Sequence, residues 1–398
     1  MAIDSPAKCV YLFDVDGVLV YPGGYRKAVE ATMRYFLAGM GLEHLTPDER
    51  VPAWFEAYNV TIEWDMLSIG LAIVLNEVAG MGPEWGRFED LDALSRWLRT
   101  RSGHPEAVDY RAGIEALCAG LPAGRIPSEA VFEAVKAGTA LLYLHGQPFV
   151  ESLLVNTRDV YHNAITRVFQ NYVLGSATFE QVYGIPSPLP AESYLSRYDQ
   201  PALLPGANGC LPTPGMAMAV YTARPSLPPR AATQPVDRLF SPEAEPALAL
   251  VGLQDAPLIA SGRMHYLAAL TGNPPEAFVK PSPVQALAAI LAAALQDEWE
   301  AIQLAYRLYA RQQDGAGLDT ELLRGLPEKM RIHVFEDSSG GIAGVRQAAE
   351  ILRDFSVETE VLGWGIAQEA LKVERLQAIH VPVFPDINQA LAAALAAG

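Results

Sequence analysis

The sequence has little cysteine, few basic residues and no apolar stretch of membrane-spanning length. Its three cysteines, Cys9, Cys118 and Cys210, are far apart and odd in number. They fit neither a disulfide framework nor a metal-binding cysteine cluster, so they indicate a reducing compartment. The Ala/Leu-rich stretch 286–295 is too short to span a bilayer. The N-terminus lacks the basic region and long apolar stretch of a signal peptide, so none is expected. We therefore expect a cytoplasmic protein.

Acidic residues outnumber basic ones, 46 to 29, which gives a formal net charge of −17. This charge disfavours sequence-independent binding to nucleic acid or to an anionic membrane surface. It does not exclude a small phosphorylated ligand, because a bound cation and a few local basic groups can outweigh the global field. We expect a globular protein with neither nucleic acid nor membrane as a partner, and the sequence leaves the oligomeric state open.

Strand signals are nearly absent between residues 25 and 183, where apolar residues recur at helical spacing. Thr46, Pro47 and Glu49 have the pattern of a helix start, with a cap, a proline at the first helical position and a capping-box acid. A stretch rich in proline and glycine follows from 184 to 215. Further helices are expected near 61–79, 90–101, 105–119, 128–142 and 150–175.

Short apolar runs predict buried strands on either side of this helical region. They predict an α/β fold with a parallel sheet, in which residues 1–22 and 216–398 form a discontinuous core. Residues 23–215 would be an inserted, mainly helical domain. The helix that opens at Pro283 is expected to run as far as Arg311. The expected strands are 10–13, 216–221, 257–260 and 331–335.

The first strand ends in two carboxylates, Asp14 and Asp16, followed by Gly17. Carboxylates are poor strand residues and costly to bury, so a pair at the end of a core strand needs a partner. Oxygen ligands that converge at a strand's carboxyl end are typical of a seat for Mg²⁺. Taken alone, the two aspartates could instead merely end the strand and cap the next segment.

Later segments end in polar residues as well: Thr222 and Arg224, then Lys280, then the adjacent acids Glu336 and Asp337. In a parallel sheet the carboxyl ends of the strands lie on one edge, so these distant residues can share a site. Thr222 could hydrogen-bond a phosphoryl oxygen, and Lys280 could neutralise charge on the nucleophile and the phosphate.

The aspartates supply the reactive groups of such a site. Asp14 and Asp337 would bind Mg²⁺. The Asp14 carboxylate could attack phosphorus and form an acyl-phosphate. Asp16 could protonate the leaving oxygen and then deprotonate the attacking water.

The order and neighbours of these residues resemble the haloacid dehalogenase (HAD) superfamily, in its subclass with a helical cap inserted after the first motif. The four motifs of that superfamily match residues 13–19, 220–225, 279–283 and 334–342. The resemblance implies a Rossmann-like core and an aspartyl-phosphate mechanism.

The resemblance also implies a role for individual residues. Mg²⁺ would be bound by Asp14, by the backbone carbonyl of Asp16 and by Asp337, with Glu336 in support. Ala223 and Arg224, which directly follow Thr222, are expected beside the phosphate together with Thr222 and Lys280.

These features predict a Mg²⁺-dependent phosphatase that hydrolyses a phosphoric monoester of a small metabolite. One alternative is a phosphomutase of the β-phosphoglucomutase type, and another is a non-catalytic HAD-fold binding or regulatory protein. The second is disfavoured because Asp14, Asp16 and Lys280 are all present. The sequence does not name the substrate. Side chains of the helical region that could contact an anion, although a solvated or structural role is the stronger interpretation for each, are Arg26, Arg34, Arg158, Arg167, His145 and His162.

Overall fold

The protein forms two compact units joined by two chain crossings. The computed structural model describes residues 7–58, 60–81, 85–122, 125–204, 216–236, 239–280, 282–315 and 322–397. Met1–Pro22 and Asp199–Gly398 make up one unit, called here the sheet unit, and Gly23–Tyr198 make up the other, the helical unit. Residues 199–204, which the sequence placed in the inserted domain, therefore belong to the sheet unit, and 205–215 lie outside the described residues.

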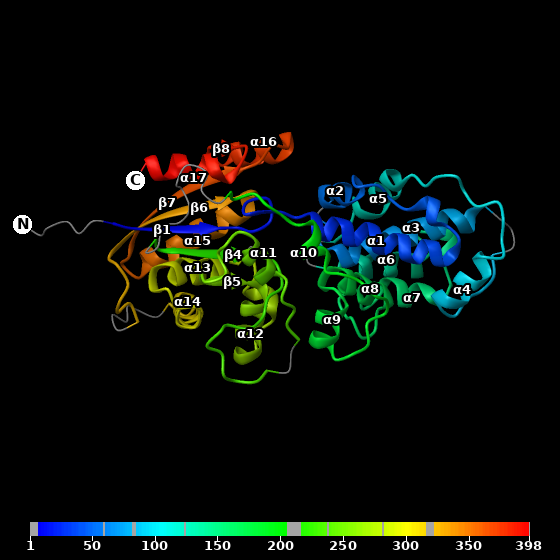
Figure 1. The fold of residues 1–398 in the computed structure, drawn as a ribbon, viewed down its shortest axis with the longest axis horizontal. Coiled ribbons are helices and arrows are strands. Elements are labelled where there is room, and N and C mark those ends of the chain that lie inside the picture. The colour runs from blue at the N-terminus through cyan, green and yellow to red at the C-terminus, as the bar shows by residue number, and fades with distance from the viewer. Residues whose placement is uncertain are drawn as a thin grey trace, which may run out of the picture. The chain divides into compact units, whose positions relative to one another are not determined.

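The sheet unit is built on six parallel strands in the order β5-β4-β1-β6-β7-β8. In Figure 1 the blue β1 lies between the green β4 and the orange β6. The predicted α/β fold with a parallel sheet is confirmed. The strands are β1 (Lys8–Phe13), β4 (Met218–Thr222), β5 (Leu258–Ala260), β6 (Lys329–Glu336), β7 (Glu358–Ile366) and β8 (Val383–Phe384).

Both faces of this sheet are buried, as parallel sheets require. Along β1, Val10 and Leu12 belong to one apolar cluster, and Tyr11 and Phe13 belong to another. The alternation follows from the two-residue period of a strand. The first cluster holds α12 (Ser261–Thr271), α13 (Pro283–Leu295), α14 (Glu298–Gln313) and α15 (Ser339–Asp354), together with Leu376 of α16 (Ala370–Ala378). The second holds α11 (Ala244–Leu250) and α17 (Ile387–Ala396).

The helix expected to run from Pro283 to Arg311 is in fact two helices, α13 and α14. Gln296 adopts a left-handed conformation with φ of 58°, which ends α13. Asp297 then caps α14 by accepting a hydrogen bond from the backbone N–H of Glu300. A non-glycine residue at positive φ carries little signal in sequence, so the break was not predicted.

The helical unit buries its own apolar core among helices that pack on α3 and α1. The segment 150–175, expected as one helix, is two. The helix expected at Thr46 begins at Val51, and the Thr46 hydroxyl donates to the carbonyl of Glu43. No helix among the described residues is long and apolar enough to cross a membrane. The helices are α1 (Gly23–Met40), α2 (Val51–Ala57), α3 (Glu63–Gly80), α4 (Leu91–Leu98), α5 (Tyr110–Cys118), α6 (Pro127–Lys136), α7 (Phe149–Leu154), α8 (Ala164–Leu174), α9 (Ser176–Tyr183) and α10 (Tyr194–Tyr198).

Two short strands mark the crossings between the units. β2 (Val20–Tyr21) precedes the helical unit, and β3 (Gln200–Pro201) follows it. They pair antiparallel with each other, Val20 with Pro201 and Tyr21 with Gln200. The chain therefore leaves and re-enters the sheet unit side by side.

A buried histidine lies in a row of aromatic rings across the sheet. His333 of β6 stacks on Tyr11 at 4.8 Å between ring centroids and on Trp364 at 5.9 Å. The Trp364 indole N–H donates to its Nδ1 at 3.2 Å, and its Nε2 has no hydrogen-bond partner among the described residues. Burial, aided by Arg331, lowers the pKa of His333, which favours the neutral form of the ring.

We expect the sheet unit to lose stability in mild acid because of His333. A histidine whose pKa is lowered by folding contributes stability above its unfolded pKa of about 6.5, and that contribution is lost as the pH falls through the folded value. The loss amounts to about 1.4 kcal/mol for each unit by which the pKa is lowered. Urea denaturation between pH 7.5 and 5 should show this slope for the natural chain and a smaller slope for His333→Phe. Replacing the exposed His380 provides the control, and equal slopes for both variants would contradict the prediction.

Candidate active site

Asp14 and Asp16 leave the end of β1 on a turn that only a glycine fits. The backbone N–H of Asp14 donates to the carbonyl of Phe335 and so extends the pairing of β1 with β6 by one residue. Gly17 adopts φ of 76°, and a Cβ there would lie 2.8 Å from Oδ2 of Asp337. The turn thus brings the chain against Asp337 and carries Asp16 past the strand end.

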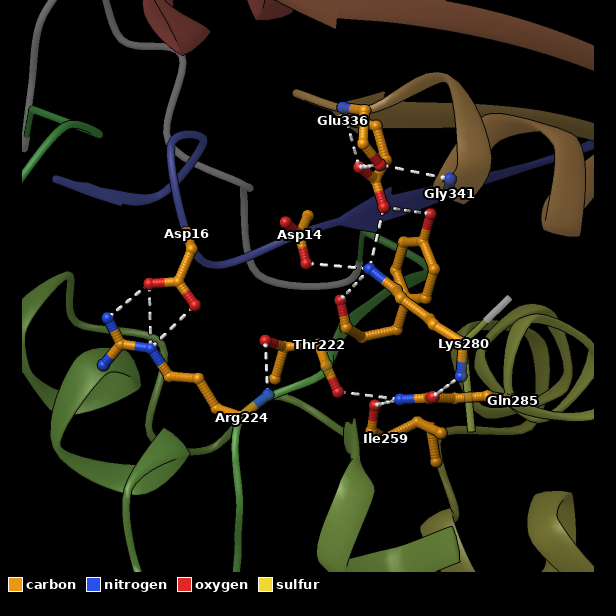
Figure 2. Close-up of polar contacts among 11 residues, drawn as sticks. Asp14, Asp16, Thr222, Arg224, Ile259, Lys280, Gln285, Glu336 and Gly341 are labelled. Carbon is orange, nitrogen blue, oxygen red and sulfur yellow. Dashed lines mark hydrogen bonds and ion pairs between the residues drawn. The ribbon is translucent and has the colours of Figure 1, made fainter. Parts of the chain in front are cut away.

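Lys280 connects the ends of three strands, and Figure 2 shows its contacts with Asp14 and Glu336. Its ammonium lies 2.8 Å from Oδ1 of Asp14 and 2.7 Å from Oε1 of Glu336. It donates to the carbonyl of Tyr221 at 3.3 Å and lies 3.7 Å from the centroid of the Tyr221 ring. The sequence predicted that Lys280 lies at the end of a strand, but in the structure it lies in a turn just before α13.

That turn is fixed by Gln285, a buried residue in the first turn of α13 that the sequence did not single out. Its Oε1 accepts a hydrogen bond from the backbone N–H of Lys280 at 2.8 Å. Its amide donates to the carbonyls of Thr222 and Ile259 at 2.8 and 3.0 Å (Figure 2). Gln285 therefore sets Lys280 at a fixed height against the ends of β4 and β5.

Glu336 is enclosed at the end of β6 and accepts hydrogen bonds on both carboxylate oxygens. Tyr221 donates to Oε1 at 3.0 Å, and Ser338 donates to Oε2 through its hydroxyl at 2.8 Å and its backbone N–H at 3.2 Å. Ser338 also caps α15 by accepting from the N–H of Gly341. A Cβ at Gly341 would overlap the Glu336 carboxylate, so the close approach of this helix requires glycine.

Thr222 and Ala223 lie where the sequence expected them, at the end of β4. The Thr222 side chain is buried and accepts a hydrogen bond from the backbone N–H of Arg224 at 3.2 Å, which leaves its own proton to donate. Ala223 is exposed.

The structure differs from the sequence in its placement of the Arg224 side chain. The expected phosphate contact is replaced by carboxylates: the guanidinium bonds both oxygens of Asp16 and Oδ2 of Asp199. Arg224 is buried, and its positive charge is paired with these two carboxylates. Asp199 was not singled out in the sequence, because it is 25 residues from Arg224 and begins no motif.

Three carboxylates could hold a divalent cation together. One oxygen from each of Asp14, Glu336 and Asp337 lies within 4.8 Å of the others. Lys280 contacts Oδ1 of Asp14, and Lys372 of α16 contacts Oδ2 of Asp337 at 2.5 Å, so the second oxygen of each aspartate is the one that could face a cation. Three hard oxygen ligands near two ammonium groups leave an excess of negative charge, which fits Mg²⁺.

The titration behaviour of the cluster has the same origin. Burial, together with the carboxylates of Glu336 and Asp337, raises the pKa of Asp14 well above its usual range, and Lys280 only partly opposes the shift. Burial also raises the pKa of Asp337 against the effect of Lys372. Burial disfavours a charged Lys280, but Asp14 and Glu336 outweigh it and raise the pKa of the ammonium. A cation added to this cluster would stabilise the ionised carboxylates.

Comparison with solved structures gives the fold. No protein-family profile matches the chain, and no curated protein matches it in sequence. A Northeast Structural Genomics Consortium target designated ZR25 aligns over 96% of this chain and 96% of its own, with a TM-score of 0.56 and 14% identity. The likeness is one of fold. Phosphatase Tt82 from Thermococcus thioreducens aligns over 93% of this chain and 98% of its own at 15% identity, but its TM-score of 0.40 is too low to carry a conclusion.

Among the candidate anion contacts of the helical unit, Arg26 is exposed, and the other five have partners inside that unit. Arg34 pairs with Glu30, and Arg158 pairs with the buried Asp65. Arg167 donates to the carbonyls of Val160 and Tyr161. His145 bonds the carbonyl of Val135, and His162 bonds Asp159.

Proposed function

We propose that this chain is a Mg²⁺-dependent phosphatase of the HAD type that hydrolyses a phosphoric monoester of a small metabolite. The observation that carries the proposal is the cluster of three carboxylates formed by Asp14, Glu336 and Asp337, two of which, Asp14 and Glu336, share the Lys280 ammonium. A structural ion pair needs one carboxylate for each cation, whereas this arrangement has more acid than base and lies at the carboxyl ends of parallel strands.

In this proposal Asp14 is the nucleophile. One carboxylate oxygen forms a bond to phosphorus while the bond from phosphorus to the leaving oxygen breaks, and Asp16 gives its proton to that oxygen. Asp16 then takes a proton from the water that attacks phosphorus and frees Asp14. Lys280 holds Asp14 in place, and the Thr222 hydroxyl donates to a phosphoryl oxygen.

Bound Mg²⁺ would be held by Asp14 and Asp337, with the backbone carbonyl of Asp16, and would offset the charge that gathers on the phosphoryl oxygens. Glu336 would support the group by holding Lys280. The helical unit would act as the cap that the resemblance implies.

The proposal is tested by phosphate release from a panel of phosphorylated metabolites, with Mg²⁺ and with a chelator. We expect release that requires the cation and disappears in Asp14→Asn, an uncharged variant of nearly the same shape. Release that persists in Asp14→Asn would mean that Asp14 is not the nucleophile. An isomerised sugar phosphate in place of free phosphate would identify a phosphomutase instead.

Removing Lys372 should strengthen Mg²⁺ binding, because its ammonium occupies one oxygen of the proposed ligand Asp337. The Lys372 side chain is 42% exposed, and an ion pair of this kind contributes about 0.5–1 kcal/mol. We therefore expect Lys372→Met to bind Mg²⁺ roughly two- to fivefold more tightly in calorimetric titration. Lys329→Met, which removes a pair with the more exposed Glu358 on the same sheet, is the control. Weaker binding by Lys372→Met would mean that the lysine orients Asp337 for the cation.

A further inference from the structure

Arg224 is far more enclosed than the other cations of the site. Its side chain is 1% exposed, against 17% for Lys280 and 42% for Lys372. A guanidinium in this position presents no open face to a phosphoryl group. Its function has to be sought in the groups that it does contact.

Arg224 binds the Asp16 carboxylate through the Nε and Nη2 edge of its guanidinium (Figure 2). Nε donates to both oxygens at 3.0 Å, and Nη2 donates to Oδ1 at 2.6 Å. Asp16 itself is 35% exposed and lies in a turn, so without this grip its side chain would be free to change rotamer. A charge-assisted fork of this kind fixes the orientation of a carboxylate as well as its distance.

The other end of Arg224 is anchored to a carboxylate that cannot move into solvent. Nη1 donates to Oδ2 of Asp199 at 2.9 Å, and the Asp199 side chain is 2% exposed. Asp199 directly precedes β3, and Asp16 forms a bridge to Val20, the first residue of β2. Arg224 thus ties the turn that carries Asp16 to the base of the β2–β3 ribbon.

We propose that Arg224 is a positioning residue for Asp16, held in place by Asp199; this role rests on the proposed function. Arg224 forms and breaks no covalent bond and gives up no proton. It sets the Asp16 carboxyl where it can give a proton to the leaving oxygen, and it stabilises the carboxylate that remains after the transfer.

This role makes a prediction that a merely structural role does not. When the leaving group is the anion of a weakly acidic alcohol or phenol, it departs only if it is protonated as its bond to phosphorus breaks. The anion of the more acidic 4-nitrophenol departs without protonation. A misplaced Asp16 therefore slows the poor leaving groups selectively. It also slows the second half-reaction, in which Asp16 takes a proton from water.

The test uses the full chain with Mg²⁺ and a series of phosphate esters, from 4-nitrophenyl and phenyl phosphate to a simple alkyl phosphate. The variant is Arg224→Met combined with Asp199→Asn, which removes the buried pair as a unit so that Asp199 is not left as an unpaired buried charge. We expect kcat/KM to fall roughly 100-fold for the alkyl ester and less than about threefold for 4-nitrophenyl phosphate. A burst of 4-nitrophenolate should precede slow turnover, because the aspartyl-phosphate would accumulate.

The matched control is Arg263→Met, which removes another buried arginine of the sheet unit. Arg263 bonds Glu245 and the carbonyl of Leu227, and its side chain is 2% exposed. Its loss should lower stability and change kcat/KM by the same factor for every ester. The same uniform factor in the Arg224 variant would overturn the positioning role while the phosphatase proposal stands. A natural chain that releases phosphate from no ester would overturn the proposed function, and the positioning role with it.

Discussion

Replacing Lys280 with methionine is expected to destabilise the sheet unit by about 3–5 kcal/mol and to abolish phosphate release. The ammonium is the shared partner of Asp14 and Glu336, whose carboxylates belong to the same cluster. Without it, two enclosed carboxylates face each other with no positive charge between them. Burial already raises the pKa of Asp14. Loss of Lys280 removes the group that opposes this shift, so Asp14 would be protonated at higher pH and would lose its power as a nucleophile.

Two measurements separate these effects. Urea denaturation should show the loss of stability in Lys280→Met. Adding Glu336→Gln to the same chain should restore part of it, because one of the two unpaired charges is gone. Phosphate release should stay absent in the double variant, since Asp14 still lacks its cation. If Lys280→Met is as stable as the natural chain, Lys280 does not balance the buried acids.

A single added methyl group at Gly341 should lower stability by nearly as much as Lys280→Met, whereas the same group at the neighbouring Gly340 should have little effect. Gly340→Ala places a Cβ in open space in the first turn of α15, and we expect it to be neutral or up to about 1 kcal/mol more stable. Gly341→Ala places the Cβ into the Glu336 carboxylate. That carboxylate cannot swing away, because Tyr221, Lys280 and Ser338 hold it. We expect a loss of about 2–4 kcal/mol.

The two alanine variants are compared by chemical denaturation. They share composition, helix and charge, so the difference between them isolates the contact with Glu336. Shortening that side chain with Glu336→Asp should recover part of the stability lost in Gly341→Ala, because it withdraws the carboxylate from the methyl group. Equal stabilities for the two alanine variants would show that α15 can shift to admit a side chain and that Glu336 is less firmly held than its contacts indicate.

The sequence predicts the parts of the site that lie in continuous segments. An apolar run ending in Asp14 and Asp16, and another ending in Glu336 and Asp337, place four carboxylates because a buried strand must end where its polar residues begin. The parallel sheet then brings the two runs together, since β1 pairs with β6 residue by residue.

What the sequence could not supply is the set of contacts between segments. Arg224 was expected beside a phosphate because it follows Thr222, but its partner Asp16 is 208 residues away. Lys372 and Gln285 meet the site through helices, where a side chain's direction depends on how the helix packs. Tyr221 resembled any other core aromatic until its hydroxyl was found against Glu336.

The β2–β3 ribbon has a consequence for how such a chain can be rearranged. An inserted segment costs its host little when its two ends already meet, since closing the gap takes no extra ordering of the host chain. Val20 and Tyr21 lie against Gln200 and Pro201, so a short reverse turn between Pro22 and Asp199 could replace residues 23–198. The helical unit can in this sense be exchanged as a cassette. Such an exchange keeps Asp14 and Lys280 in the host, but it alters the segment next to Asp199, the anchor of Arg224. A graft whose junction is shifted by one residue would therefore first change the orientation of the Asp16 carboxylate, the proposed proton donor.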